Sequence, residues 1–540
     1  MFETKGEKRW AIYTGILIMV ITTVPYCIAY GLDSNMVFSG FLFGVEDGNS
    51  YIAKMLSGSA GDWLFRSPYT TFPQSGFLAF FPYILMGKLS SAPAQHDQLI
   101  FIFHFFRWVT GILLTVTTHL FCCIFLKDIR LRKMATIIAL VGGGFGWVSL
   151  LGVGNSINSG QPLEFYSPET FGFLSLLGLP HLLAAKTFLL LGFIFLLKND
   201  HTLKNRLAGG LCWLITGFFQ PLTIVTGWAV LVCYLLLIIF QEFVRQRFSL
   251  HNLERLRPQI ISAITMILIS SLWVLYNYFS FKWDPYLSGW ASQNLILSPP
   301  IWDYLLSFSI FLPFSLMGVW KSLRKSNEPN YALPAAFVLA FPFLAYAPFN
   351  LQRRLPDGIW LALVILALSL FDMNSKKKKL VIPQFFLIFS LITPVTILAG
   401  GMQTILHPSI PVYRPLSETR AFEYLDETAT KGSVVLASYE TSNALPAWAP
   451  VRVLVGLGPE SVNFDEVSSQ VNDFYFGSVS ADEQMEFLEE NSVDYVFYGP
   501  LEKNMGRWDP ASAGYMRKVY DQDGYLIFLV SSADGTEKAK

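Results

Sequence analysis

The sequence predicts an α-helical polytopic membrane protein with about 11 to 13 transmembrane helices, followed by a C-terminal exoplasmic α/β domain. First, 53% of the 540 residues are hydrophobic and only 14% are charged, which is too apolar for an ordinary soluble protein. Second, apolar runs long enough to cross or enter a bilayer recur from residue 10 to residue 401. Third, the composition becomes mixed after residue 401. We therefore divide the chain into a transmembrane domain, 1–401, and a soluble domain, 402–540.

The basic residues set the predicted topology. They gather at the N-terminus and in the segments 127–133, 198–206, 244–257, 321–325 and 375–379. The positive-inside rule places all of these segments in the cytosol. This requires about eleven crossings, with the run 76–92 lying in the membrane interface. The N-terminus is then cytosolic, whereas the first loop, 32–75, and the soluble domain are exoplasmic. These placements predict a multi-pass protein of the plasma membrane.

Two local features of the transmembrane domain carry their own expectations. The run 207–220 would reach only about 21 Å as a helix, and Pro221 follows it. We therefore expect two half-deep segments that meet at Gln220-Pro221. The glycine-rich stretch 142–147 is expected inside a membrane helix, where small residues permit close packing.

The soluble domain alternates between helix and strand patterns. The segments 416–429, with Ser417 as its cap, and 481–492 have the apolar spacing of helices. Short apolar runs predict strands at 433–438, 451–456 and 493–499. The segment 515–530 is typical of a hairpin that turns at Asp523-Gly524.

Cysteine placement and the absence of common motifs exclude several functions. All five cysteines fall in or beside apolar runs, so we predict neither a disulfide framework nor a metal-binding cluster among Cys27, Cys122, Cys123, Cys212 and Cys233. The sequence contains no P-loop, HExxH, GxSxG or dinucleotide fingerprint. Its basic residues form no nucleic-acid stripe, so we expect no nucleic-acid partner.

The most informative feature is an acidic pair just beyond the first apolar run. Glu46 and Asp47 begin a polar loop that also carries Tyr51 and Trp63. Aromatic side chains favour the bilayer surface, so they would hold the carboxylates there. A carboxylate in this place could act as a general base on a hydroxyl acceptor. The alternative is a solvated acidic pair that keeps the loop outside.

The order of residues in this loop resembles the first-loop signature of GT-C class polytopic glycosyltransferases. The matching residues, ahead of the run FLAFFPYILMGKL, are Asp47, Tyr51, Ala53, Met55, Gly61, Trp63, Pro68 and Pro73. The resemblance implies an enzyme that uses polyprenyl-phosphate-linked sugars on the exoplasmic face, with Asp47 as the catalytic base. Many relatives carry the second acid after the aspartate, whereas here Glu46 precedes it, so the division of labour within the pair stays open. The match covers about the first 110 residues, and nearly the whole chain also resembles uncharacterised bacterial membrane proteins of GT-C type.

Glu169 and His181 form a second candidate constellation. Pro180 lies between them and would break a helix, which could bring the two side chains together. Ionisable residues at membrane depth are functional candidates by default. As the alternative, His181 forms hydrogen bonds at a helix start. Glu164, nearby in the sequence, is expected to be a solvated loop acid.

Gln352, Arg353 and Arg354 form a third constellation on the predicted outer side. Two adjacent arginines there oppose the usual charge bias. A guanidinium pair can bind a phosphate at two points and stabilise it as a leaving group. Anchoring to lipid headgroups or an internal salt bridge is the alternative.

Together these residues predict an inverting glycosyltransferase of a bacterial-type cell envelope. It would move a sugar from a polyprenyl-phosphate donor to an exoplasmic hydroxyl of a glycan, lipid or protein acceptor. Asp47 and Glu46 are the expected catalytic residues, and the expected substrate contacts are Arg353, Arg354, Gln352, Glu169, His181, Tyr51 and Trp63. We expect no metal cofactor, with a divalent ion on the carboxylates as the alternative. The rival function is a lipid-linked glycan transporter or a non-enzymatic envelope assembly scaffold.

The predicted topology can be tested with introduced cysteines. Cysteines at Ser59, Ser159 and Ser480 should react with an impermeant thiol reagent added outside the cell, whereas one at Ser375 should not. The unaltered chain gives the background from its own cysteines. Labelling of the Ser159 position from the cytosolic side alone would overturn the placement of every proposed site.

Overall fold

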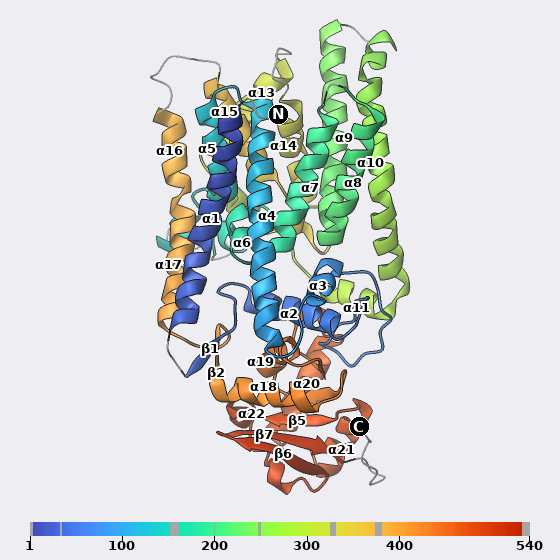
Figure 1. Ribbon diagram of the computed structural model, residues 1–540. Coiled ribbons are helices and arrows are strands. Elements are labelled where there is room, and N and C mark those ends of the chain that lie inside the picture. The colour runs from blue at the N-terminus through green and yellow to red at the C-terminus, as the bar shows by residue number, and fades with distance from the viewer. Residues whose placement is uncertain are drawn as a thin grey trace. The chain divides into compact units, whose positions relative to one another are not determined.

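The computed structural model describes residues 4–32, 35–151, 161–198, 200–246, 250–324, 331–372 and 381–531. The chain divides into two compact units (Figure 1). The first, here called the helix unit, comprises Met1–Pro25, Phe106–Tyr278 and Leu295–Gln403. The second, here called the sheet unit, comprises Tyr26–Phe105, Phe279–Asn294 and Thr404–Lys540. The sheet unit therefore contains both the predicted first loop and the predicted soluble domain.

Five helical stretches of the described residues are long and apolar enough to cross a membrane. They lie in α1 (Lys5–Gly31), α4 (Gln95–Phe125), α9 (Pro221–Gln246), α10 (Leu250–Trp283) and the consecutive α16 (Val381–Ser390) and α17 (Ile392–Leu406). A sixth arises if α12 (Ile301–Phe308) and α13 (Phe311–Arg324), bent by 87°, form one broken span. The chain is thus a helical multi-pass membrane protein. The total of 11 to 13 crossings and the sides of the termini stay predictions.

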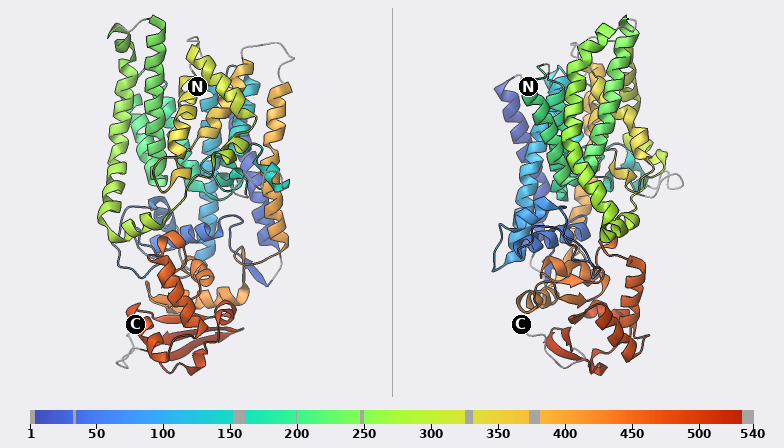
Figure 2. Two further views of the ribbon diagram at one scale, coloured as in Figure 1. Left: turned by 180° about the vertical axis from the view of Figure 1, so that it is seen from behind. Right: turned by 90° about the vertical axis from the view of Figure 1, so that its right-hand side faces the viewer.

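The shorter apolar helices form the core of the helix unit. They are α7 (Pro180–Leu196), α14 (Ala332–Ala345) and α15 (Ile359–Asp372). Residues 359–369 of α15 are buried all round, as expected for a central helix without a polar face. Gly318 of α13 permits close approach, because a Cβ there would lie 2.8 Å from the Leu366 carbonyl oxygen. α7 also packs beside α8 (Leu203–Phe219), as the views in Figures 1 and 2 show.

Three sequence expectations in the membrane region have clear outcomes. The run 76–92 contains only α3 (Phe81–Gly87), which is about 10 Å long and too short to cross. The helix break at Gln220-Pro221 is confirmed, because α8 ends at Phe219 and α9 begins at Pro221. The expectation of two half-deep segments is wrong for α9, which is long enough to span. The expectation of a helix at 142–147 is also wrong, because α5 (Ile129–Val141) ends before it.

The sheet unit is built on one mixed sheet of strand order β4-β3-β5-β7-β6. The parallel strands are β3 (Val434–Leu436), β4 (Arg452–Val453) and β5 (Tyr495–Tyr498). The hairpin of β6 (Met516–Gln522) and β7 (Tyr525–Val530) turns at Asp523-Gly524, as predicted. A separate pair joins β1 (Met36–Phe38) antiparallel to β2 (Tyr413–Pro415).

Helices of the sheet unit pack against this sheet in two apolar clusters. One contains Phe422 and Leu425 of α18 (Leu416–Thr428), and the other contains Phe474 of α20 (Phe464–Phe476). The helix α21 (Ala481–Glu490) begins with a capping box on Ser480. The predicted cap of α18 is wrong, because its N-cap is Pro415 and Ser417 lies inside the helix. The sheet unit also contains α11 (Pro285–Gln293), α19 (Tyr439–Ala444) and α22 (Pro500–Met505).

The predicted polar loop after the first span contains a helix. It contains α2 (Val45–Ser59), which packs on α3 at close range. Two glycines make this approach possible, since a Cβ on Gly58 would lie 2.1 Å from the Ile84 oxygen and one on Gly87 would lie 1.7 Å from the Met55 oxygen. The first-loop segment also joins the core of the C-terminal sheet, where Tyr69 is fully buried.

Candidate functional site

The acidic pair lies in the first turn of α2. Gly44 precedes it as the N-cap with φ 60°, a left-handed conformation that favours glycine. The side chains of Glu46 and Asp47 are exposed, in contrast to the residues that follow them. The partial positive charge of the helix N-terminus stabilises carboxylates at these positions. The structure therefore presents two exposed carboxylates at a rigid helix start and not on a mobile loop.

Residues of the C-terminal part of the chain contact this helix start within the sheet unit. The Tyr439 hydroxyl of α19 donates a hydrogen bond to Glu46 Oε2 at 3.1 Å. Burial, followed by the charge of Glu46, raises the pKa of Tyr439 to about 12, so the hydroxyl keeps its proton at neutral pH. Asn443 Nδ2 donates to the Glu46 carbonyl oxygen at 3.5 Å, and Asn49 Nδ2 donates to Asn443 Oδ1 at 2.8 Å. No sequence motif indicates these contacts, because their partners lie almost 400 residues apart.

A buried ion pair fixes the next turns of α2. Lys54 Nζ lies 2.7 Å from Glu460 Oε1, and the two side chains are 1% and 4% exposed. Glu460 Oε2 accepts a hydrogen bond from Ser67 Oγ at 2.8 Å. The Lys54 ammonium also lies 4.2 Å from the centre of the Phe80 ring, a favourable cation–π contact. Glu460 thus joins α2 to the loop that follows it.

The backbone of that loop runs beside the sheet. Val453 N, in the edge strand β4, donates to the Pro68 oxygen at 2.8 Å. The Arg452 guanidinium donates to the Thr70 oxygen at 2.7 Å. These bonds, together with the Lys54–Glu460 pair, give the first-loop segment a fixed place on the C-terminal sheet.

The two aromatic residues predicted at the bilayer surface differ in exposure. Tyr51 is buried and stacks on Tyr83 with ring centroids 4.7 Å apart. The expectation that Tyr51 lies on the surface is therefore wrong, and its burial argues for a packing role. Trp63 is 60% exposed, with Lys88 Nζ 4.1 Å from its ring centroid. A substrate contact by Trp63 stays a prediction.

In the helix unit, Gln352–Arg354 forms the short 3-10 helix η3. Arg354 Nε lies 3.5 Å from Glu169 Oε1, so the structure brings together two residues that the sequence placed in separate constellations. The Arg353 guanidinium lies 4.8 Å from the centre of the Tyr166 ring. Gln352 Oε1 accepts a hydrogen bond from Ser298 N at 3.2 Å, which ties the turn to the segment before α12.

Each of these two arginine contacts includes a buried polar atom that has no hydrogen-bond partner among the described residues. Arg353 Nε and Glu169 Oε2 are buried, and neither has a hydrogen-bond partner among the described residues. A buried donor without a partner costs about 1 to 3 kcal/mol. An anion beside Arg353 would supply the missing acceptor. Phosphate binding at this turn stays a prediction.

A buried polar network lies next to the arginine turn η3 in the chain. Asp357 accepts a hydrogen bond from Thr223 Oγ1 at 3.0 Å and lies 3.6 Å from Lys186 Nζ. Lys186 Nζ in turn donates to the Pro168 oxygen at 2.7 Å, one residue before Glu169. This network links α7, α9 and the segment after η3.

The expected break before His181 is confirmed, because α6 (Gly172–Gly178) ends before Pro180 begins α7. His181 is half-buried in the first turn of α7. Its part in substrate binding stays a prediction.

The expectation for Glu164 is wrong. Its side chain is not solvated but buried, with 1% exposure. It accepts hydrogen bonds from Gly144 N at 3.1 Å, Gly146 N at 2.9 Å and Ser307 Oγ at 2.8 Å. A Cβ on Gly146 would lie 1.8 Å from Glu164 Oε2, so this glycine is required. Glu164 therefore organises the glycine-rich turn after α5.

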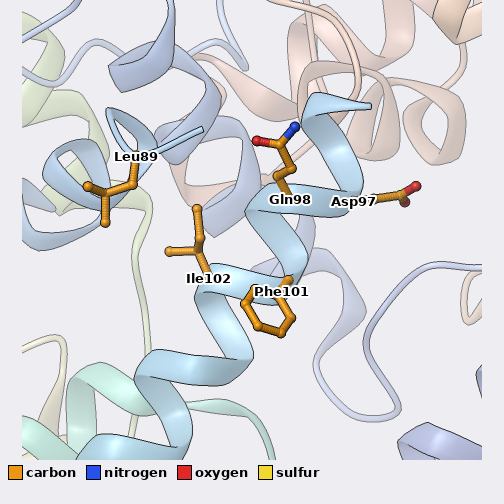
Figure 3. Close-up of a pocket in the computed structure, with 5 residues that line it drawn as sticks. All are labelled: Leu89, Asp97, Gln98, Phe101 and Ile102. Atoms are coloured by element: carbon orange, nitrogen blue, oxygen red, sulfur yellow. The ribbon is translucent and has the colours of Figure 1, made fainter. Parts of the chain in front are cut away.

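One set of metal-ligating side chains and one surface hollow involve residues other than the predicted site residues. Within the described ranges, the set of three donors close enough to hold a metal ion is Glu7, His119 and Cys123, which does not include the acidic pair of α2. A surface hollow of about 420 Å³ lies beside the first turns of α4 and is lined by Leu89, Asp97, Gln98, Phe101 and Ile102. Figure 3 shows these five side chains. Its lining contains none of the predicted catalytic or phosphate-binding residues.

Comparison with known proteins identifies the fold. No protein-family model and no curated protein sequence matches the chain. Among solved structures, the chain is similar to the archaeal oligosaccharyltransferase AglB from Archaeoglobus fulgidus, in complex with an inhibitory peptide and a dolichol-phosphate. The TM-score is 0.51 at 12% identity, and the alignment covers 97% of this chain and 75% of that chain. The arabinofuranosyltransferase AftD from Mycobacteria aligns with a TM-score of 0.55 at 12% identity, over 98% of this chain and 40% of that chain. ArnT from Cupriavidus metallidurans aligns with a TM-score of 0.50 at 13% identity, over 95% of this chain and 97% of that chain.

All three solved structures are GT-C glycosyltransferases. At these identities the likeness shows the fold. The chain is a membrane protein of the GT-C fold, which confirms the resemblance first found in the residues after the first span.

The buried ion pair below the acidic turn predicts a large effect on stability. Lys54→Met should lower the free energy of unfolding by about 3 to 5 kcal/mol, because it leaves Glu460 buried without its cation. Lys431→Met is the matched control, since its exposed pair with Asp62 also joins the first-loop segment to the C-terminal part and contributes at most about 1 kcal/mol. Thermal unfolding of the full-length protein in detergent measures both.

Adding Glu460→Gln to Lys54→Met should recover part of the lost stability, because the uncompensated charge is removed. Equal, small effects of Lys54→Met and Lys431→Met would show that the buried pair does not hold α2 in place.

Proposed function

We propose that this chain is an inverting glycosyltransferase that moves a sugar from a polyprenyl-phosphate donor to an exoplasmic acceptor hydroxyl. The observation that carries the proposal is the exposed acidic pair at the start of α2 within a GT-C fold. The structural neighbours support glycosyl transfer in general, because they include an oligosaccharyltransferase and an arabinofuranosyltransferase. The AglB structure also contains dolichol-phosphate, a lipid phosphate of the proposed donor class.

In the proposed reaction Asp47 is the general base. It takes the proton of the acceptor hydroxyl while the hydroxyl oxygen attacks the anomeric carbon of the sugar. The bond from that carbon to the phosphate oxygen breaks, and the electron pair leaves with the polyprenyl phosphate. One displacement inverts the anomeric centre. Tyr439 donates to one oxygen of Glu46, which supports Glu46 as a partner that orders the site.

Arg353 and Arg354 are proposed to hold the departing phosphate. Guanidinium groups offset its charge and donate at two points. Glu169 orients Arg354, and Tyr166 supports Arg353 by a cation–π contact. With two cations at the leaving group, the proposal includes no metal cofactor. The acceptor is a hydroxyl of a glycan, lipid or protein at the outer face of the plasma membrane.

The role of the base predicts a specific loss of turnover. Asp47→Asn should reduce transfer by about 10² to 10⁴-fold without unfolding the protein, since the acceptor proton then has no base. The full-length protein is reconstituted with a series of synthetic polyprenyl-phosphate monosaccharides and an envelope extract of cells that carry it as the acceptor source. Release of free polyprenyl phosphate reports transfer whatever the acceptor is.

Asp62→Asn is the control in the same segment and should transfer normally, because Asp62 pairs with Lys431. Near-normal release by a stable Asp47→Asn protein would move the role to Glu46 or Glu169. Full release by variants of all three carboxylates would favour the transporter or scaffold function.

If η3 binds the donor phosphate, a positive charge at positions 353 and 354 is not sufficient for full activity. Arg353→Lys or Arg354→Lys should reduce donor affinity or turnover by about 10 to 100-fold, the range for one charge-assisted hydrogen bond, because lysine lacks the planar two-point geometry. Transfer rate against donor concentration measures this. Arg420→Lys, an exposed pair with Asp523 in the sheet unit, is the control. Headgroup anchoring would leave the lysine variants fully active. In that case the Glu169 and His181 segment becomes the next candidate.

A further inference from the structure

Three metal-binding side chains meet at one end of α1 and α4 in the helix unit. His119 and Cys123 lie one turn apart on α4, so they share a face of the helix. Glu7 comes from the first turn of α1. The donor atoms of the three residues all lie within 4.8 Å of one another. Glu7 and His119 are buried and Cys123 is half-buried.

The hydrogen bonds of Thr136 fix the form of His119. The Thr136 hydroxyl donates its single proton to the Arg132 carbonyl oxygen at 2.8 Å. With its proton so placed, the hydroxyl oxygen accepts from His119 Nδ1, 3.0 Å away, in the tautomer that carries its proton on Nδ1. A neutral imidazole that donates through Nδ1 carries its lone pair on Nε2. This is the arrangement of a metal-ligating histidine, whose other ring nitrogen is held by an outer partner.

The lone pair of His119 Nε2 then faces the Glu7 carboxylate. Nε2 and Glu7 Oε1 are 3.9 Å apart, which is too long for a hydrogen bond. Two ligands about 2.0 to 2.1 Å from a tetrahedral metal ion lie roughly 3.4 Å from each other. A shift of a few tenths of an ångström would thus let both atoms bind one small cation.

The neighbouring charges select the kind of ion. Arg132 Nη1 lies 3.1 Å from Glu7 Oε1, so the guanidinium already neutralises this carboxylate. The charge of a metal ion must therefore be offset mainly by the Cys123 thiolate. Thiolate and imidazole ligands favour ions such as Zn²⁺ and Cu⁺ over Mg²⁺ or Ca²⁺. The Trp10 ring, 4.9 Å from the His119 ring, covers the cluster on one side.

We propose that Glu7, His119 and Cys123 form a binding site for a thiophilic metal ion, Zn²⁺ or Cu⁺, which joins α1 to α4. The proposal does not depend on the glycosyltransferase function. It departs from the expectation that the cysteines belong to no metal site. Cysteine spacing could not reveal this site, because the carboxylate ligand comes from a different helix, more than 100 residues earlier in the chain.

The test uses the full-length protein in detergent, without a polyhistidine tag. After treatment with a chelator, the protein is incubated with Zn²⁺ alone, or with Cu⁺ under reducing conditions, and then desalted. Elemental mass spectrometry should find about one metal ion per chain. Cys123→Ser and His119→Gln should reduce this at least about tenfold. Cys122→Ser is the matched control and should keep the metal, because Cys122 is the adjacent buried cysteine and lies outside the set.

A second readout separates binding from loss of fold. The metal should raise the melting temperature of the wild-type protein and of Cys122→Ser but not of Cys123→Ser. Co²⁺, as a zinc substitute, should give a thiolate charge-transfer absorption that Cys123→Ser removes. The proposal is overturned if the wild type binds neither ion above the level of Cys123→Ser. Equal loss of metal in Cys122→Ser would overturn it as well.

Discussion

The buried pair of Lys54 and Glu460 is the interaction on which the acidic site depends. Two charges with 1% and 4% exposure are stable only together, so each fixes the place of the other. Lys54 belongs to α2, whereas Glu460 belongs to the C-terminal part of the chain and also binds Ser67. The position of Glu46 and Asp47 is set two turns away on the same helix. The start of α2 is thus held by a C-terminal segment that the sequence presents as a separate domain.

The two kinds of charge that the proposed chemistry needs lie in different units of the fold. The carboxylates belong to the sheet unit, where Tyr439 and Asn443 contact Glu46. The guanidinium groups belong to the helix unit, where Glu169 and Tyr166 orient them. Each group is supported by residues of its own unit.

The sequence predicts those parts of the molecule that have a local cause. Apolar runs and the Asp523-Gly524 hairpin were predicted because each depends on neighbouring residues. The order of residues around Asp47 was enough to indicate the GT-C fold. The helix α2 was missed, because its polar and glycine-rich sequence becomes helical through packing on α3 and on the C-terminal sheet.

The candidate site was predicted in part for the same reason. The acidic pair and the arginine turn were found as short motifs, whereas their supporting partners come from distant segments. Tyr439 lies 393 residues from Glu46, and Tyr166 lies far before Arg353 in the chain. Glu164 was misjudged because its acceptors are filled by backbone amides of a turn that only the folded chain forms.

The most direct measurement is a cryo-electron microscopy structure of the full-length protein in a lipid nanodisc with a bound polyprenyl phosphate. The central claim is that the arginine turn binds the phosphate of the proposed polyprenyl-phosphate donor. It predicts that the phosphate oxygens accept hydrogen bonds from Arg353 and Arg354. A phosphate bound away from both arginines would contradict it.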